Sequence, residues 1–201
     1  MNDYSDTSIV ELATIVAGHL EKRGIRVVLV GGLAVEIYTE NLYLTKDIDM
    51  VNSSYNAPSE INNAMSEIGF HKQGRVYINE TTEICVEFPS APLSVGDQII
   101  QDTTRIKTGY GELPILFATD VVKDRLAAYF HWNDRQSLVQ ALAVMNKHSV
   151  SPEKLRAFCN SEGKPEQFKL LEELWQHLQE KDLSTMKAIE ALIIEETLNS
   201  L

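Results

Sequence analysis

Apolar positions in the first 30 residues predict a helix followed by a buried strand. A helix from Ser8 to about Arg23 is indicated by apolar residues three or four positions apart, namely Ile9, Leu12, Val16 and Leu20. Ser8 and Glu11 have the spacing of a capping box, and Gly24 is a natural helix stop. The run Arg26–Val30 is continuous, apolar and β-branched, as expected for a strand in the centre of a sheet.

Mixed helix and strand patterns continue to about residue 118 and then give way to helical ones. The first part predicts, in order, a helix, a strand, a second helix and four further strands: Leu33–Thr39, Asp47–Val51, Ser59–Ile68, Arg75–Ile78, Glu83–Phe88, Thr104–Thr108 and Leu113–Phe117. The later part predicts five helices: residues 120–131, 134–147, 152–160, 165–180 and 183–198. We therefore expect an α+β protein in which a mixed sheet flanked by helices, residues 1–118, precedes a C-terminal helical bundle, residues 119–201.

Composition narrows the class of protein. The chain has 201 residues, of which 44% are hydrophobic, enough for the core of one domain with a helical appendage. Its two cysteines, Cys85 and Cys159, are too few for a disulfide framework and lack zinc-ligand spacing. No apolar run reaches the roughly 20 residues that span a bilayer, and no signal-peptide pattern opens the sequence. We expect a cytoplasmic protein with reduced thiols and no membrane association.

The formal net charge of −11 is distributed unevenly. Residues 1–100 carry six basic and fourteen acidic side chains, and residues 157–201 carry four basic and nine acidic ones. Only residues 101–156 have a small basic excess, with eight basic and six acidic side chains. Because broad nucleic-acid binding needs a basic surface, a large RNA partner is compatible only with this middle segment, whereas a small anionic ligand needs just a few local cations.

Two short motifs carry most of the chemistry. Gly31-Gly32 lies between a predicted strand and a predicted helix, where the backbone can approach a phosphate and helix N–H groups can bind it. Asp47 and Asp49 are two positions apart on a predicted strand, so both carboxylates lie on one face. Such oxygen ligands suit Mg²⁺ or Mn²⁺, which also bind substrate phosphates. The sequence contains neither a P-loop nor a dinucleotide fingerprint.

A third carboxylate is expected from a later strand. There an alternation of period two places Glu83, Cys85 and Glu87 on one face and apolar residues on the other. An acidic side chain within an apolar strand is costly unless it is paired or bound to a metal. Glu87, between Val86 and Phe88, is therefore the preferred third ligand, and Glu83 is the alternative.

Together these segments resemble a known superfamily. The motifs Gly31-Gly32-Leu33-Ala34, Thr45-Lys46-Asp47-Ile48-Asp49 and the later Glu87 are similar to those of the DNA polymerase β-type nucleotidyltransferases, in particular small bacterial abortive-infection toxins and minimal nucleotidyltransferases. The resemblance implies a nucleotidyltransferase-like sheet, a Mg²⁺ or Mn²⁺ site formed by Asp47, Asp49 and Glu87, and transfer of a nucleoside monophosphate from a nucleoside triphosphate such as ATP to an acceptor hydroxyl. It also implies nucleotide binding by Gly31, Gly32, Thr45 and Lys46.

The resemblance extends into the helical half. Asp120-Val121-Val122-Lys123 and Asp134-Arg135 are similar to that group's helix with a phosphate-binding lysine and a second helix with a charged start. Lys123, behind Thr119 as the expected N-cap, is a candidate for binding the β- and γ-phosphates, and a solvated surface lysine is the alternative. Further candidates are a cationic wall of Arg125, Arg135 and His131, and three aromatics that either stack on a base or belong to the core: Tyr129, Phe130 and Trp132.

Two departures from the family pattern leave alternatives open. Tyr43 stands where the family often has arginine, and the third acid is Glu87 rather than aspartate. The alternative to an active enzyme is a catalytically degenerate nucleotide-binding or antitoxin-like regulatory module with a protein partner. A third interpretation is a protein in which Asp47 and Asp49 are only a solvated strand end. The sequence does not define the acceptor, whether tRNA, a protein or a small molecule.

Overall fold

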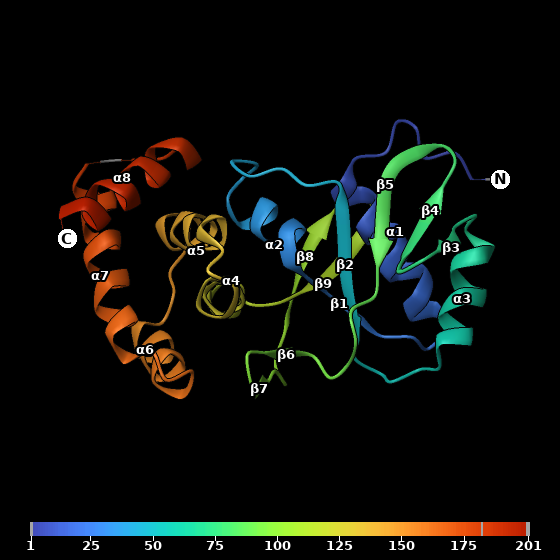
Figure 1. The fold of residues 1–201 in the computed structure, drawn as a ribbon. Coiled ribbons are helices and arrows are strands. Elements are labelled where there is room, and N and C mark those ends of the chain that lie inside the picture. The colour runs from blue at the N-terminus through green and yellow to red at the C-terminus, as the bar shows by residue number, and fades with distance from the viewer. Residues whose placement is uncertain (1, 182, 200–201) are drawn as a thin grey trace. The chain divides into compact units, whose positions relative to one another are not determined.

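The structure is a computed structural model that describes residues 2–181 and 183–199, with side chains described as far as residue 196. These residues form a seven-stranded mixed sheet, a two-stranded hairpin and eight helices, so the predicted α+β class with a mixed sheet is confirmed (Figure 1). The chain divides into two compact units. A sheet unit comprises Met1–Ile37, Leu44–Ser94 and Ile99–Leu116, and a helical unit comprises Tyr38–Tyr43, Val95–Gln98 and Phe117–Leu201.

The sheet unit is built on seven strands. They are β1 (Val27–Val30), β2 (Asp47–Asn52), β3 (His71–Gln73), β4 (Val76–Asn79), β5 (Thr82–Glu87), β8 (Thr104–Thr108) and β9 (Gly111–Ile115). Their spatial order is β3–β4–β5–β2–β1–β9–β8. The central β1 is antiparallel to β2 and parallel to β9, and β2 is parallel to β5. Strands that are distant in the sequence are therefore neighbours in the middle of the sheet.

The two faces of the sheet have different chemistry. Helix α1 (Ile9–Lys22) packs against β1, β9 and α3 (Pro58–Glu67), and α2 (Gly31–Tyr38) follows β1 directly. Leu29, Ile48 and Met50 are fully buried on the face covered by α1. Because successive strand residues alternate in direction, Asp47 and Asp49 lie on the opposite face. The apolar side of β2 thus fixes the direction of its two carboxylates.

Helix α1 begins with the predicted capping box. The backbone N–H of Glu11 donates to Ser8 Oγ at 3.4 Å, and the backbone N–H of Ser8 donates to Glu11 Oε2 at 3.0 Å. Arg23 ends the helix as its C-cap, and the following Gly24 has a φ of +74°. Both predicted ends of this helix are therefore confirmed.

Loss of the helix cap at Ser8 should lower the free energy of unfolding by a measurable amount. The Ser8→Ala variant is expected to lose about 1 kcal/mol of unfolding free energy, because an N–H of the first turn loses its acceptor. Urea unfolding followed by circular dichroism measures this loss. Ser5→Ala, a nearby exposed serine outside the cap, is the control, and equal losses in the two variants would contradict the role of the cap.

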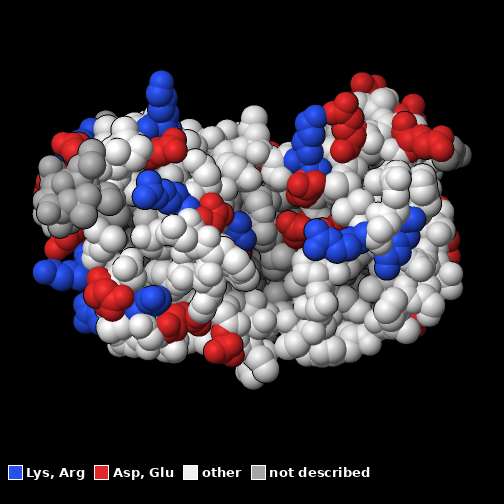
Figure 2. Space-filling model, viewed as in Figure 1, with Lys and Arg blue, Asp and Glu red and all other residues white. Residues whose placement is uncertain are grey.

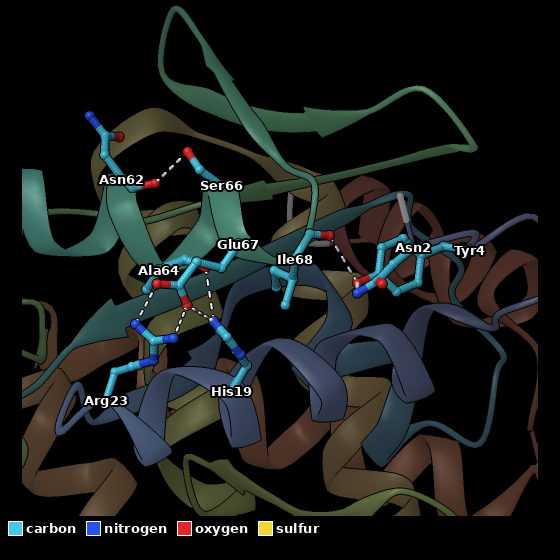
Figure 3. Close-up of polar contacts among 9 residues, drawn as sticks. All are labelled: Asn2, Tyr4, His19, Arg23, Asn62, Ala64, Ser66, Glu67 and Ile68. Carbon is cyan, nitrogen blue, oxygen red and sulfur yellow. Dashed lines mark hydrogen bonds and ion pairs between the residues drawn. The ribbon is translucent and has the colours of Figure 1, made fainter.

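Polar contacts join α1 to α3 beside their apolar interface (Figure 3). His19 Nε2 lies 2.9 Å from the carbonyl oxygen of Ala64 and 3.3 Å from Glu67 Oε2. Arg23 forms an ion pair with the same Glu67 carboxylate. At the same end of α3, the Tyr4 hydroxyl donates to the carbonyl oxygen of the C-cap residue Ile68 at 3.0 Å. These contacts fix α3 along α1 and satisfy polar groups at its C-terminal end.

An ion pair connects α1 to the edge strand β8 and gives a pH-dependent contribution to stability. Arg105 Nη2 donates to Glu21 Oε1 at 2.6 Å, and this hydrogen bond lowers the pKa of Glu21 below its usual range. A lowered carboxyl pKa stabilises the folded state above the unfolded pKa, and this stabilisation is lost as the pH falls through the folded value. Both side chains are about half exposed, so the contribution is small.

We therefore expect Arg105→Gln to be about 0.2 to 1 kcal/mol less stable than the wild type at pH 7. The difference should shrink as the pH falls from 7 to 3, because protonation of Glu21 removes the charge that pairs with Arg105. Urea unfolding at pH 7 and pH 3 measures both values. A difference that does not change between the two pH values would contradict the assignment.

The structure differs from the predicted elements at several places. Strand β3 was not predicted because its three residues are all exposed and polar, and β6 (Ser94–Val95) and β7 (Gln98–Ile99) are too short for a pattern. Helix α2 begins at Gly31, not Leu33, because glycine lets β1 pass into the helix without a linker. The prediction of Thr119 as N-cap was wrong, since Phe117 holds that position. Helix α8 begins at Met186 instead of residue 183.

The helical unit contains the five predicted C-terminal helices. They are α4 (Ala118–Trp132), α5 (Arg135–Lys147), α6 (Pro152–Ser161), α7 (Pro165–Glu180) and α8 (Met186–Asn199). Its core includes Leu142, Phe158 and Leu178, all fully buried. In the described part of the chain, no helix combines the length and apolar character needed to cross a membrane.

Candidate functional site

Neighbouring strands bring the three predicted carboxylates to one face of the sheet unit. In the parallel pair β2–β5, Asp47 lies opposite Cys85 and Asp49 lies opposite Glu87. Paired positions on adjacent strands share a face, so Asp47, Asp49 and Glu87 project on the same side. Asp47 is exposed, whereas Asp49 and Glu87 are partly buried. The period-two pattern predicted which residues share a face, and the strand register shows which of them are neighbours.

Gly31 lies directly against the Asp49 carboxylate. Its φ is +66°, and a Cβ placed on it would lie 2.3 Å from Asp49 Oδ2. Real Cβ atoms essentially never make so short a contact, so a side chain at this position is disfavoured both by the backbone conformation and by Asp49. The absence of a side chain allows the end of β1 and the start of α2 to pass close to the acidic face, which is the sheet face that carries Asp47, Asp49 and Glu87. The close backbone approach in the structure is to the Asp49 carboxylate, and the approach of the same backbone to a phosphate stays a prediction.

The helix that begins at Gly31 supplies backbone donors. Gly32, Leu33 and Ala34 form its first turn, where N–H groups lack carbonyl partners within the helix. Leu33 and Ala34 are fully buried, which holds this turn in place. The glycine pair is thus part of a rigid strand-to-helix transition at the edge of the acidic face.

Cys85 is part of the acidic face, although no functional role was predicted for it. Its Sγ donates to Asp47 Oδ1 at 2.9 Å. Burial, followed by the nearby Asp47 and Asp49 charges, raises the pKa of the Cys85 thiol to about 12. The thiol is therefore protonated at neutral pH and acts as a hydrogen-bond donor to Asp47. The alternation Glu83-x-Cys85-x-Glu87 was the signal that could have identified it.

Thr45 and Lys46 have structural partners in the segment that leads into β2. The Thr45 N–H donates to Glu36 Oε2 at 2.8 Å, and the Asp47 N–H donates to Thr45 Oγ1 at 3.2 Å. Glu36 is a buried carboxylate on α2 that the sequence patterns did not single out. Its one signal was an acidic residue in the otherwise apolar run Leu33–Ile37. These bonds fix the position of Asp47 relative to α2.

The two glutamates of β5 have different partners. Glu83 forms an ion pair with Lys46, in which both side chains are largely exposed, and the pair raises the pKa of Lys46 and lowers that of Glu83. Glu87 is only 28% exposed and lies 3.8 Å from Arg75 Nε. Of the two predicted third ligands, Glu87 is therefore the one that is partly buried opposite Asp49.

Lys123 belongs to the helical unit. It is buried on α4, and its Nζ donates to Asp120 Oδ1 at 2.9 Å. Lys123 is therefore not a solvated surface lysine, and its ammonium group is already paired with the Asp120 carboxylate. The same carboxylate also affects Tyr38 in this unit, where burial, followed by the charge of Asp120, raises the pKa of the Tyr38 hydroxyl to about 12.

Two other candidates of the helical unit, Arg125 and His131, are also engaged in local contacts. Arg125 Nε donates to Asp124 Oδ2 at 3.0 Å, and His131 Nε2 lies 2.7 Å from Glu162 Oε2. The Tyr129 and Phe130 rings contact each other, while Trp132 is 76% exposed. Arg125 and His131 thus each face an acid, which reduces the positive charge of the predicted cationic wall.

The chemistry of the three carboxylates suits a hard divalent cation. Carboxylate oxygens from Asp47, Asp49 and Glu87 are the ligands preferred by Mg²⁺ and Mn²⁺. Among residues 2–181 and 183–199, however, no three His, Cys, Asp or Glu side chains are already grouped so that they could hold a metal ion. Metal binding at this face would therefore need the three carboxylates to move closer together.

Comparison of the chain with models of known protein families and with curated proteins gives no match.

Proposed function

We propose that the protein is a metal-dependent nucleotidyltransferase of the DNA polymerase β type. The observation that carries the proposal is the register of β2 and β5, which aligns Asp47 and Asp49 with Cys85 and Glu87 on one face. The approach of Gly31 to Asp49 supports it, because it brings the first turn of α2 next to the acids. This combination of backbone donors and carboxylates suits a triphosphate with its cation.

In this proposal Asp47 and Asp49 hold Mg²⁺ or Mn²⁺, and Glu87 completes the ligand set. When bound, the cation would offset the negative charge of the triphosphate and of the departing pyrophosphate. The acceptor oxygen forms a bond to the α-phosphorus, the bond from that phosphorus to the bridging oxygen breaks, and pyrophosphate leaves with the electron pair. Glu87 takes up the acceptor hydroxyl proton.

The nucleotide would be positioned by groups around this face. Gly31 and Gly32 supply the start of α2, and Thr45 and Lys46 flank the two aspartates. Lys46 would exchange its partner Glu83 for a phosphate. Lys123 stays a predicted phosphate ligand, and this role requires it to leave Asp120.

The acceptor class is constrained by charge. On the face drawn in Figure 2, acidic and basic side chains of the described residues are interspersed instead of forming one basic area. With a net charge of −11, this pattern favours a protein or small-molecule acceptor over a long RNA.

A catalytically degenerate, nucleotide-binding regulatory module is the second candidate. It is favoured by the ion pair between Glu87 and Arg75 and by the hydrogen bond from Cys85 to Asp47, because both occupy carboxylates that catalysis needs. A protein of this kind binds nucleotide with Mg²⁺ but releases no pyrophosphate.

One experiment separates the two candidates. Purified protein is incubated with Mg²⁺ or Mn²⁺ and each α-³²P-labelled nucleoside triphosphate, with cell extract as the source of acceptors. Transfer of label with release of pyrophosphate, lost on addition of EDTA, supports the enzyme. Metal-dependent nucleotide binding by calorimetry without label transfer supports the regulatory module. Absence of both binding and transfer contradicts both candidates.

A further inference from the structure

A cavity lies in the sheet unit, at the end of β1 away from the acidic face. Its volume is about 310 Å³, and its lining includes Val27 and Val28, the first two residues of β1. Asp49 instead lies opposite Val30, the last residue of that strand. The volume is at the lower end of the roughly 300 to 1,000 Å³ found for small-molecule sites. The cavity therefore suits a small ligand and is separate from the proposed nucleotide site.

The wall of this cavity is held by a network of hydrogen bonds in the loop after β2. Ser53 N–H donates to the Arg26 carbonyl at 2.9 Å, and Arg26 N–H donates to Ser54 Oγ at 2.8 Å. The buried Asn52 donates from Nδ2 to the carbonyl of Asn56 at 3.0 Å and so closes the loop around residue 55. The network ties this loop to the start of β1, so the cavity wall is preorganised.

Tyr55, at the tip of this loop, has features that packing does not explain. Its φ is +57°, a conformation that is unfavourable for a bulky residue. Its side chain is 69% exposed, although it lines the cavity. Burial thus gives little compensation for the backbone strain. A strained, exposed aromatic ring over a cavity is typical of a residue retained for a ligand.

The charges of the cavity indicate an anion. Arg105 and the acidic Glu21 both line it and are paired with each other, so their charges offset. Arg26 also lines it and is exposed, and within the described part of the chain no carboxylate forms an ion pair with its guanidinium. The planar Arg26 guanidinium can form a bidentate pair with one carboxylate of a ligand. The remaining lining includes apolar side chains from Ala17, Leu93 and Pro114.

We propose that this cavity binds a small carboxylic acid with a flat apolar body. Arg26 pairs with the carboxylate, the Tyr55 ring covers the apolar body, and the apolar lining receives it. The inference is independent of the nucleotidyltransferase proposal, because no residue of the acidic face takes part.

The test uses 2-naphthoate as the probe. One control, 2-naphthalenemethanol, has the same apolar ring system but no charge, and the other, acetate, has the carboxylate but no apolar ring system. Binding to the purified full-length protein is followed by calorimetry and by NMR without nucleotide or metal. We expect 2-naphthoate to bind with a Kd of about 1 mM or tighter, and both controls to bind at least about tenfold more weakly.

Two variants identify the residues. Arg26→Gln should weaken 2-naphthoate binding at least about tenfold and leave the uncharged probe unchanged. Tyr55→Gly should weaken both probes without lowering the melting temperature, because glycine relieves the positive φ. Lys107→Gln, an equal loss of charge outside the cavity lining, should bind like the wild type. Failure of 2-naphthoate to bind, or equal binding to wild type and Arg26→Gln, would overturn the proposal.

Discussion

Replacement of Asp49 by Asn is expected to reduce nucleotidyl transfer by at least about 1,000-fold. Asp49 lies opposite Glu87 and against Gly31, so it is central to the proposed metal site. Loss of one charged ligand removes several kcal/mol of charge stabilisation from the transition state, and each 1.4 kcal/mol corresponds to about tenfold in rate. Label transfer from the preferred nucleotide, measured at saturating Mg²⁺, gives the rate ratio.

The same variant should fold at least as well as the wild type. Neutralising Asp49 reduces repulsion among neighbouring carboxylates, so the melting temperature without metal should stay equal or rise. Mg²⁺ should raise the melting temperature of the wild type but not that of Asp49→Asn. Asp102→Asn, an exposed carboxylate outside the acidic face, is the matched control. A variant Asp49→Asn that keeps more than about a tenth of the activity contradicts the assignment.

Replacement of Gly31 by Ala is expected to cost about 2 to 5 kcal/mol of unfolding free energy. The φ of +66° is unfavourable for alanine, at a cost of about 1 to 2 kcal/mol. The new Cβ would also lie 2.3 Å from Asp49 Oδ2, so the carboxylate or the start of α2 must move, which adds about 1 to 3 kcal/mol. Urea unfolding measures the total, and the displaced Asp49 should also reduce activity.

Gly24→Ala isolates the steric part of this effect. Gly24 has a similar φ of +74°, but nothing lies within 4 Å of a Cβ placed on it. Its variant should therefore show only the conformational cost, and the difference between the two variants measures the contact with Asp49. In the double variant Gly31→Ala/Asp49→Ala the clash with the carboxylate is gone, so the combined loss should be smaller than the sum. Equal losses at Gly31 and Gly24 would contradict the contact.

Local patterns in the sequence were sufficient for most elements and for the direction of the key side chains. The alternation of Asp47 and Asp49 with buried Ile48 and Met50 was readable, because strand side chains repeat every two residues. The same reasoning placed Glu87 on one face of its own strand. The capping box of α1 was also readable from Ser8 and Glu11, because both partners lie within four residues.

Contacts between distant segments were not readable in the same way. Nothing local indicates that β2 pairs with β5 in parallel, since β3 and β4 intervene in the chain and occupy the edge of the sheet. The bond from Cys85 to Asp47 depends on that pairing. The contact of Gly31 with Asp49 likewise depends on the register of β1 and β2. These features follow from tertiary structure, which a periodic pattern does not encode.

The position of β9 next to β1 also has a consequence for synthesis on the ribosome. Leu29 pairs with Ile115, about 86 residues later in the chain, so one edge of β1 has no partner until that segment emerges. At about 5 to 20 residues per second, this interval lasts roughly 4 to 17 seconds. During it the apolar strand Val27–Val30 presents open backbone groups, a typical site of association between nascent chains. Chaperone capture of ribosome-bound chains should therefore decline once β9 is available for pairing.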